Sequence, residues 1–152
     1  MLLVVSHTLV AAAGFAAGVY FLPILIAPPP PNAAEHAAAV DAAQFKGKFR
    51  PDLKGSDALH WGDGTVYLGR KAIALKGKVA PGPDYKIYLS PEFIDTRADF
   101  LRVKPRMLRV GEVKTFENFV VPIAESVDLT GYNTVAIWCE RFQMFITAST
   151  YR

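Results

Sequence analysis

The sequence has few of the residues on which most catalytic and metal sites depend. It contains one cysteine and three histidines among 152 residues. No C-x-x-C or H-x-x-x-H spacing for zinc occurs, and no C-x-x-C-H motif for covalent haem. A G-x-S-x-G elbow, a phosphate-binding loop and a dinucleotide fingerprint are also absent. Nothing here indicates a hydrolase or a nucleotide-dependent enzyme, and we do not predict an enzyme.

Charge is missing from the first 27 residues, which contain no Asp, Glu, Lys or Arg. As a helix this segment would be about 40 Å long, enough to cross a bilayer. A cleaved signal peptide would begin with a basic residue, have a shorter apolar run and end at a small-x-small site. This run is longer, and it ends in "APPPP". We therefore predict that residues 1–27 form an uncleaved transmembrane anchor.

The side of the membrane does not follow from charge. All 17 Lys and Arg residues lie from Lys46 onward, which by itself would favour the cytoplasm. The positive-inside rule, however, counts charges near the membrane, and folded domains are translocated largely regardless of charge.

Residues 28–44 form a proline-rich spacer followed by a short helix. Pro28 to Pro31 favour a stiff polyproline segment. In "NAAEHAAAVDAAQ", Asn32 is a suitable helix cap, and Glu35 lies at the capping-box position. His36 is expected to be solvated on this helix.

From residue 45 to 152, short β-branched and aromatic runs alternate with turn residues. The segments "FKGKFRP", "GTVYLGRK", "AIALKGKV", "YKIYLSP", "FLRVKPRMLRV", "TFENFVVPI" and "TVAIWCERFQMFITAS" are expected to be strands, with "WGDG", "APGPD" and "LTGYN" as turns. The predicted fold is an all-β antiparallel sandwich of about seven to nine strands.

The last predicted strand contains Cys139. Both alternating sets of its side chains are apolar in the first half, which indicates a central strand buried on two sides. Cys139 should then point the same way as Ile137, into a core.

Several segments resemble one known family. The stretches "DALHWGDGTVYL", "IALKGKVAPGPDYKIYLSPEFID" and "VGEVKTFENFVVPIAESVDLTGYNTVAIWCERFQMFITAS" are similar, in order and spacing, to the Skeletor-type (DM-thirteen) electron-transfer domain that occurs beside DOMON domains. The resemblance implies a β-sandwich outside the cytoplasm and a role in electron transfer, with the cysteine at Cys139 as the suspected redox or cofactor-ligating group. The ending "FITAS" departs from the glycine-containing ending of the family.

Cys139 has two interpretations. A thiolate could ligate haem iron or another soft metal, or act as a redox group, and Arg141 two residues on could lower its pKa. Cysteine is also among the most frequently buried residues, so it could be an inert core side chain. With one cysteine, no internal disulfide can form.

His60 is the next candidate ligand. It precedes a predicted tight turn beside Trp61, and Met107 and Met144 could complete a haem or metal site with it. The alternative is a histidine that only hydrogen-bonds in the turn. Haem and no cofactor at all fit the sequence equally well, and no metal can be named.

Two surface patterns suggest partners. Arg102, Lys104 and Arg106 alternate with apolar residues in a predicted strand, and Arg109 follows. They could dock an acidic partner or lipid headgroups, or form an ordinary solvated face. In the membrane segment His7, Ala11, Gly14 and Gly18 share one helix face of small-xxx-small type, which favours a transmembrane helix partner.

Two functions remain open at this stage. The first is an electron-transfer or haem-binding domain anchored in the cytoplasmic membrane with its C-terminal domain in the periplasm. The second is a non-enzymatic accessory subunit of a membrane complex without a cofactor. Both place the chain in the lipid bilayer, and neither involves nucleic acid.

Overall fold

Eight strands form two antiparallel four-stranded sheets in the computed structural model, which describes residues 1–152. The first sheet has the order β1-β2-β3-β6 and the second β5-β4-β7-β8. The strands are β1 (Ala43–Phe49), β2 (Gly62–Gly69), β3 (Ala72–Val79), β4 (Tyr85–Ser90), β5 (Leu108–Val113), β6 (Val120–Pro122), β7 (Thr134–Cys139) and β8 (Met144–Thr150). This agrees with the predicted number of strands.

The sheets pack face to face because their strands alternate in the expected way. In β1, Phe49 is buried whereas Lys46 and Lys48 are exposed. The core between the sheets takes Val66 and Leu75 from the first sheet and residues such as Ile87, Leu89 and Ile137 from the second. The edge strands β1 and β8 of the two sheets are joined by a hydrogen bond from the Lys48 backbone N–H to Ser149 Oγ at 2.8 Å.

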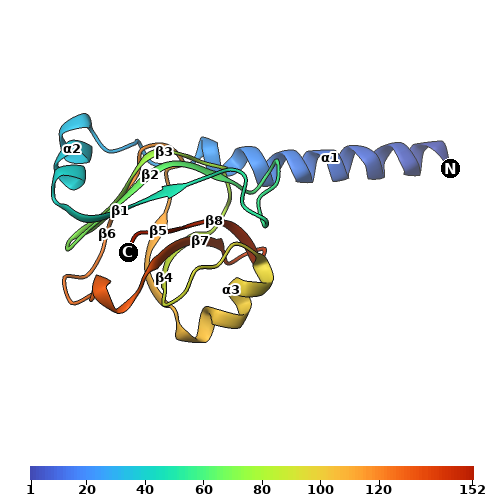
Figure 1. Cartoon of the computed structure of the whole chain (residues 1–152). Coiled ribbons are helices and arrows are strands. Elements are labelled where there is room, and N and C mark those ends of the chain that lie inside the picture. Colours follow the sequence, from blue (N-terminus) through green and yellow to red (C-terminus); the bar gives the residue numbers. More distant parts are fainter.

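Two amino-terminal helices flank the sandwich (Figure 1). Helix α1 (Leu2–Leu25) projects away from the sheets, and it is long and apolar enough to cross a membrane, a property that signal sequences share. Helix α2 (Ala33–Asp41) is capped as predicted, because the Asn32 side chain accepts from the Glu35 N–H at 2.9 Å. His36 is not solvated as expected: its Nε2 lies 2.8 Å from Leu75 O and attaches α2 to β3.

The predicted strand "FLRVKPRMLRV" is wrong over its first part, which is helical. Residues Arg97–Val103 form α3, a 3-10 turn η1 covers Lys104–Arg106, and only Leu108 onward is a strand. Thr96 caps the helix by accepting from the Asp99 N–H at 3.1 Å. Phe100 and Val103, three residues apart, bury one face of it against the outer side of the second sheet.

The single long strand predicted for residues 134–149 is a hairpin instead. Strands β7 and β8 are joined by Glu140–Gln143, where Gln143 has a φ of 49°. All six residues of β7 are buried, as expected for a central strand. Two other expectations also change: "TFENFVVPI" is a strand only at Val120–Pro122, and "WGDG" runs into β2 instead of forming a turn.

A second, smaller core lies outside the second sheet. It joins Trp138 and Tyr88 of the sheet to Phe100 of α3. The rings of Trp138 and Phe100 stack with 4.0 Å between centroids and 1° between planes, and Tyr88 meets Phe100 edge-on at 5.1 Å. Trp138 and Cys139, neighbours in the sequence, therefore belong to opposite faces of the same sheet.

Candidate functional site

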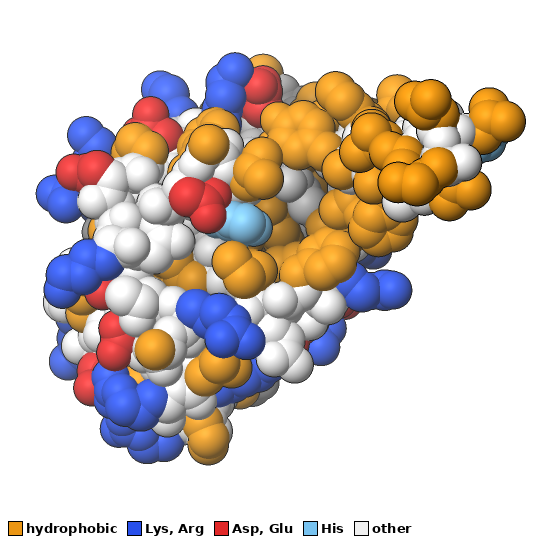
Figure 2. All heavy atoms as spheres, turned by 90° about the vertical axis from the view of Figure 1, so that its right-hand side faces the viewer, with side chains coloured by type: hydrophobic (Ala, Val, Ile, Leu, Met, Phe, Trp, Pro, Cys, Tyr) orange, Lys and Arg blue, Asp and Glu red, His pale blue; other side chains and the backbone are white.

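An apolar pocket of about 600 Å³ lies between one end of the sandwich and helix α1. Ten of its fourteen lining residues are hydrophobic. Figure 2 shows hydrophobic side chains continuing from the projecting helix over this end of the domain, where they border a hollow. The lining comes from α1 (Phe15, Ala16, Val19, Tyr20), from the segments before β2 and β4 (Leu59, His60, Pro81, Gly82, Pro83), and from the strands and hairpin turn (Tyr85, Cys139, Phe142, Met144, Ile146).

Cys139 forms part of the pocket wall at the end of β7. Its side chain belongs to the core between the sheets together with Ile137, as the alternation predicted. The residue is only 2% exposed, and burial raises the pKa of its thiol. Arg141 does not share a strand face with it, because Arg141 lies exposed in the turn after β7. Arg141 lowers the pKa of the thiol only through a backbone hydrogen bond, which burial outweighs, so the pKa is raised and not lowered as expected.

The backbone around Cys139 departs from a regular ladder. The β7–β8 register shifts between Ile137 and Trp138, one residue before the cysteine. Such bulges re-aim the side chains that follow them. On the other side Cys139 pairs directly with Tyr85 of β4. The pocket wall is thus built from the last residue of one central strand and the first of its neighbour.

His60 contributes the pocket's most polar side chain. Its Nδ1 donates to both carboxylate oxygens of Asp57 at 2.9 Å. This hydrogen bond from His60 is the main cause that lowers the pKa of Asp57, so Asp57 stays ionised and fixes the orientation of the imidazole. The other ring nitrogen, Nε2, has no protein partner and is available to a ligand.

The structure brings three of the four predicted ligand candidates together. Met144 lines the pocket with Cys139 and His60. Met107 does not, because it packs against the outer core around Trp138 on the opposite side of the sheet. No cluster of three or more His, Cys, Asp or Glu side chains that could hold a metal occurs in the molecule.

The predicted basic surface exists in a different form. Its residues lie on α3, η1 and β5 instead of on one strand face, and each is paired with an acid. Arg102 contacts Glu92 at 3.1 Å and Asp99 at 3.4 Å, Arg106 also contacts Glu92, Lys104 lies 2.7 Å from Glu140, and Arg109 lies 2.9 Å from Glu112. These pairs leave little net positive charge for docking an acidic partner.

Lys104 and Glu140 instead complete the outer aromatic core, a feature that the sequence did not reveal. The Lys104 ammonium lies 5.6 Å from the Trp138 ring centroid and 5.7 Å from that of Tyr88. Glu140 accepts from Lys104 and from the Tyr88 hydroxyl. Because α3 was predicted as a strand, nothing placed Phe100 or Lys104 over Trp138.

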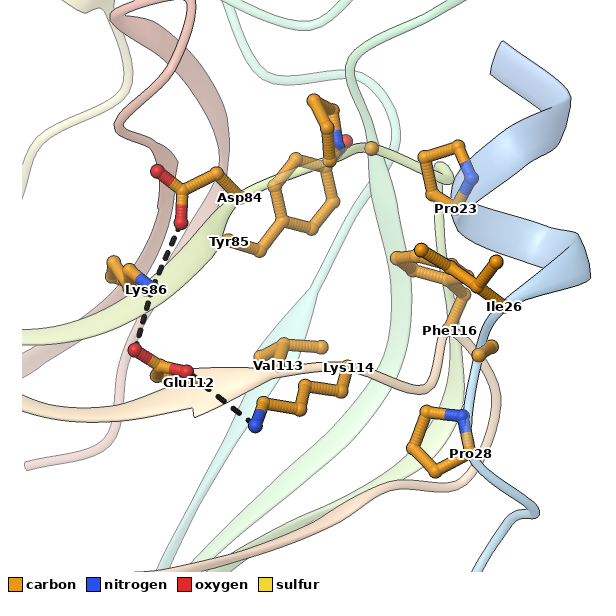
Figure 3. Close-up of a pocket in the computed structure, with 13 residues that line it drawn as sticks. Pro23, Ile26, Pro28, Asp84, Tyr85, Lys86, Glu112, Val113, Lys114 and Phe116 are labelled. Carbon is orange, nitrogen blue, oxygen red and sulfur yellow. Dashed lines mark hydrogen bonds and ion pairs between the residues drawn. The ribbon is translucent and has the colours of Figure 1, made fainter. Parts of the chain in front are cut away.

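The end of α1 is held against the domain next to the pocket (Figure 3). Pro23, the only buried residue of α1, and Ile26 face Phe116 across a cavity of about 180 Å³. A chain of ion pairs lies on its far side: Lys86 Nζ is 2.8 Å from Asp84 and 2.6 Å from Glu112, and Lys114 Nζ is 3.7 Å from Glu112.

The wall between the two cavities consists of Gly82, Pro83 and Tyr85, which line both. A Cβ at Gly82 would collide with the Tyr85 ring, so this position requires glycine for close approach.

The remaining part of α1 has no partner in the chain. Gly14 and Gly18 have open space around the position of a Cβ, and Ala11 is exposed. His7 bonds within the helix, from Nδ1 to Leu3 O at 2.7 Å. The small-residue face predicted for helix packing is therefore exposed.

We expect the buried tyrosines to ionise at alkaline pH only as the domain unfolds. Burial raises the pKa of Tyr151 to about 12 and also raises the pKa of Tyr85 and Tyr88. Each of these tyrosines has a higher pKa in the folded domain than in the unfolded chain, where it is about 10. The free energy of unfolding is therefore unaffected by them below about pH 10 and decreases as the pH rises above it. Tyrosinate absorbance should therefore develop in two phases, the later one together with loss of circular dichroism. A single phase near pH 10 without unfolding would contradict this.

Comparison with known families gives one match. The family model described as "Electron transfer DM13" matches residues 48–151. No curated protein and no solved structure matches the chain.

Proposed function

The chain belongs to the electron-transfer DM13 family, and on this basis we propose that it is a membrane-anchored electron-transfer domain whose redox site is the pocket around Cys139. Its amino-terminal helix would hold the domain at the outer face of the cytoplasmic membrane. The observation that carries the proposal is the convergence of Cys139, His60 and Met144, from three separate segments, on one apolar cavity.

The pocket suits electron transfer because it places polarisable groups in a mainly apolar lining. A thiol, a thioether and an imidazole face a mainly hydrophobic space in which electrostatic effects are stronger than in water. The single cysteine excludes an internal thiol–disulfide couple, so the proposal requires a bound group or a partner protein that exchanges electrons with this site.

Haem is one group to test in this pocket. When bound, it would supply one-electron chemistry at iron, and His and Met side chains are known to hold haem iron together. Of the side chains present, His60 Nε2 and the Met144 sulfur are better suited as ligands than Cys139. The raised pKa of Cys139 keeps its thiol protonated, whereas a metal binds the thiolate.

A redox titration of the full chain purified from native membranes tests the proposal. We expect a reversible transition whose midpoint potential shifts by about 60 mV or more, a tenfold change in a one-electron equilibrium, in Cys139→Ser and in Met144→Leu. Met107→Leu is the matched control, because the same change is made on the opposite side of the sheet, and it should leave the transition unchanged. An absorbance scan on the same samples shows whether a Soret band is present.

A second function, the accessory subunit, is favoured by the exposed small-residue face of α1 around Gly14 and Gly18. Under this alternative the protein packs against another transmembrane helix, and the preparation is colourless. Absence of any redox transition in wild-type protein that copurifies with a membrane partner would replace the electron-transfer proposal with this one.

A further inference from the structure

We propose that the pocket beside α1 binds the headgroup of a membrane-dissolved quinone. This inference rests on the proposed electron-transfer function and on membrane anchoring through α1. It names the chemical class of the group that carries the electrons. Its basis is the level of the pocket relative to the lipid, its apolar rim and the His60 imidazole in its lining, which Asp57 orients.

The first step concerns where the pocket opens. Helix α1 has 24 residues and is about 36 Å long, whereas the hydrocarbon core of a bilayer is about 30 Å thick. The core therefore takes up about 20 of these residues. Counted from Leu2, the core ends near Phe21, so on the helix side of the pocket Val19 and Tyr20 lie close to the edge of the hydrocarbon and Phe15 lies about 9 Å inside it. A ligand dissolved in the lipid would reach the cavity without crossing water.

The second step concerns the rim of the pocket on the domain side. Leu59 and Phe142 line the pocket and are 57% and 47% exposed, respectively. Pro81 and Pro83 lie beside them. Large apolar side chains exposed together mark an interaction surface, and here they line the same pocket as α1. Figure 2 shows the hydrophobic surface running from the helix onto the domain. The rim is therefore suited to contact lipid and the isoprenoid tail of a quinone.

The third step concerns the polar group, which separates a quinone from a plain lipid chain. Asp57 accepts from His60 Nδ1, so in the neutral imidazole Nε2 is an acceptor, suited to the hydroxyl of a quinol. This single acceptor can hold a quinol ring by its hydroxyl among apolar side chains. An acyl chain has no group that would use this nitrogen.

The size of the cavity agrees with such a ligand. A volume of about 600 Å³ lies within the roughly 300–1,000 Å³ usual for small-molecule sites, which are mostly apolar with few polar groups. Tyr85 and Cys139 form its inner end, so a bound ring would lie against the central strands of the second sheet.

Photolabelling of the full chain in lipid nanodiscs tests this inference. An azidobenzoquinone is irradiated with the protein, decylubiquinol competes, and mass spectrometry locates the label. We expect label within residues 57–60, 81–85 or 139–144. In His60→Phe, half-displacement should need about 10-fold more decylubiquinol, the effect of losing one hydrogen bond to the ligand. Asp57→Asn, which preserves the shape but removes the carboxylate that orients the imidazole, should act in the same direction.

The control is His36→Gln, which removes a histidine outside the pocket and keeps a donor for Leu75 O. It should behave like the wild type. Equal displacement in His60→Phe and His36→Gln, label outside the pocket, or displacement by oleate as effective as by decylubiquinol would each overturn the inference. A Soret band that His60→Phe abolishes would also overturn it, since the pocket would then hold haem.

The two proposals fail in different ways. A redox transition that depends on Cys139 and Met144, without saturable quinone labelling, would leave the electron-transfer function standing and remove the quinone. Saturable labelling without any redox transition would leave a quinone-binding pocket but remove the electron-transfer function, and with it the role of the quinone as electron carrier.

Discussion

Replacing Trp138 by alanine is expected to lower the free energy of unfolding by about 3–5 kcal/mol, the usual cost of removing a large buried aromatic side chain. Trp138 is fully buried and stacks on Phe100, which is also fully buried. Its loss leaves a cavity between the second sheet and α3 and removes the ring beneath the Lys104 ammonium. A domain with a total stability of about 5–15 kcal/mol would lose a large part of it.

Guanidinium unfolding of the full chain in detergent, followed by circular dichroism, measures this loss. Trp61→Ala is the control, because Trp61 is only partly buried and lies near α1 instead of in the outer core. It should cost much less. Equal losses for the two variants would show that the outer aromatic core contributes no more to stability than a partly exposed tryptophan does.

The sheets could be predicted because their physical signals are local. Alternation such as that of Lys46, Lys48 and Phe49 fixes which side of β1 is buried, and the prediction for β1 differs from the structure by only two residues at each end. The cap formed by Asn32 depends on a side chain three residues from its partner, and it was also confirmed. The family resemblance was confirmed over residues 48–151.

Helix α3 was not predicted because the spacing of its apolar residues suits a strand as well as a helix. Leu101 and Val103, two residues apart, suggest a strand, whereas Phe100 and Val103, three apart, suggest a helix, and the segment is too short for periodicity to decide. A better indication of the helix was the pair Thr96 and Asp99, since Thr96 caps the helix by accepting from the Asp99 N–H. The β7–β8 hairpin was missed for a different reason: its turn, Glu140–Gln143, contains neither Gly nor Pro.

The site was only partly predictable because it depends on contacts that are distant in the sequence. The alternation in β7 placed Cys139 in the core correctly. Nothing local, however, distinguishes Met144 in the pocket from Met107 outside it, because the difference arises from which face of the second sheet each residue packs against. The same holds for His36, whose partner Leu75 lies 39 residues away.

The central strand β7 connects the two parts of the domain that could take part in electron transfer. Its consecutive residues Trp138 and Cys139 face the outer aromatic core and the pocket, respectively. A substitution at either one should therefore be tested for effects on the other side. Trp138→Phe, which keeps an aromatic ring on Phe100, is the variant with which to separate stability from the redox transition.

Placing two arginines in the middle of α1 is expected to release the protein from the membrane. Ala13 and Ala17 are exposed on the helix and near its centre. An arginine at the centre of a membrane helix costs about 2.5–3.5 kcal/mol, so Ala13→Arg with Ala17→Arg costs about 5–7 kcal/mol. The share of protein that resists extraction by alkaline carbonate should fall from nearly all to a small fraction.

The matched control places the same charges on the other amino-terminal helix. Ala34→Arg with Ala37→Arg alters two exposed positions of α2, which lies outside the proposed span, and should leave membrane association intact. If both double variants stayed in the pellet, α1 would not be what holds the protein there. If the wild type were soluble and its intact mass lacked the first 27 residues, α1 would be a cleaved signal sequence. The pocket would then lose its helix side, since Phe15, Val19 and Tyr20 would be absent from the mature protein, and with them the lipid route proposed for the quinone.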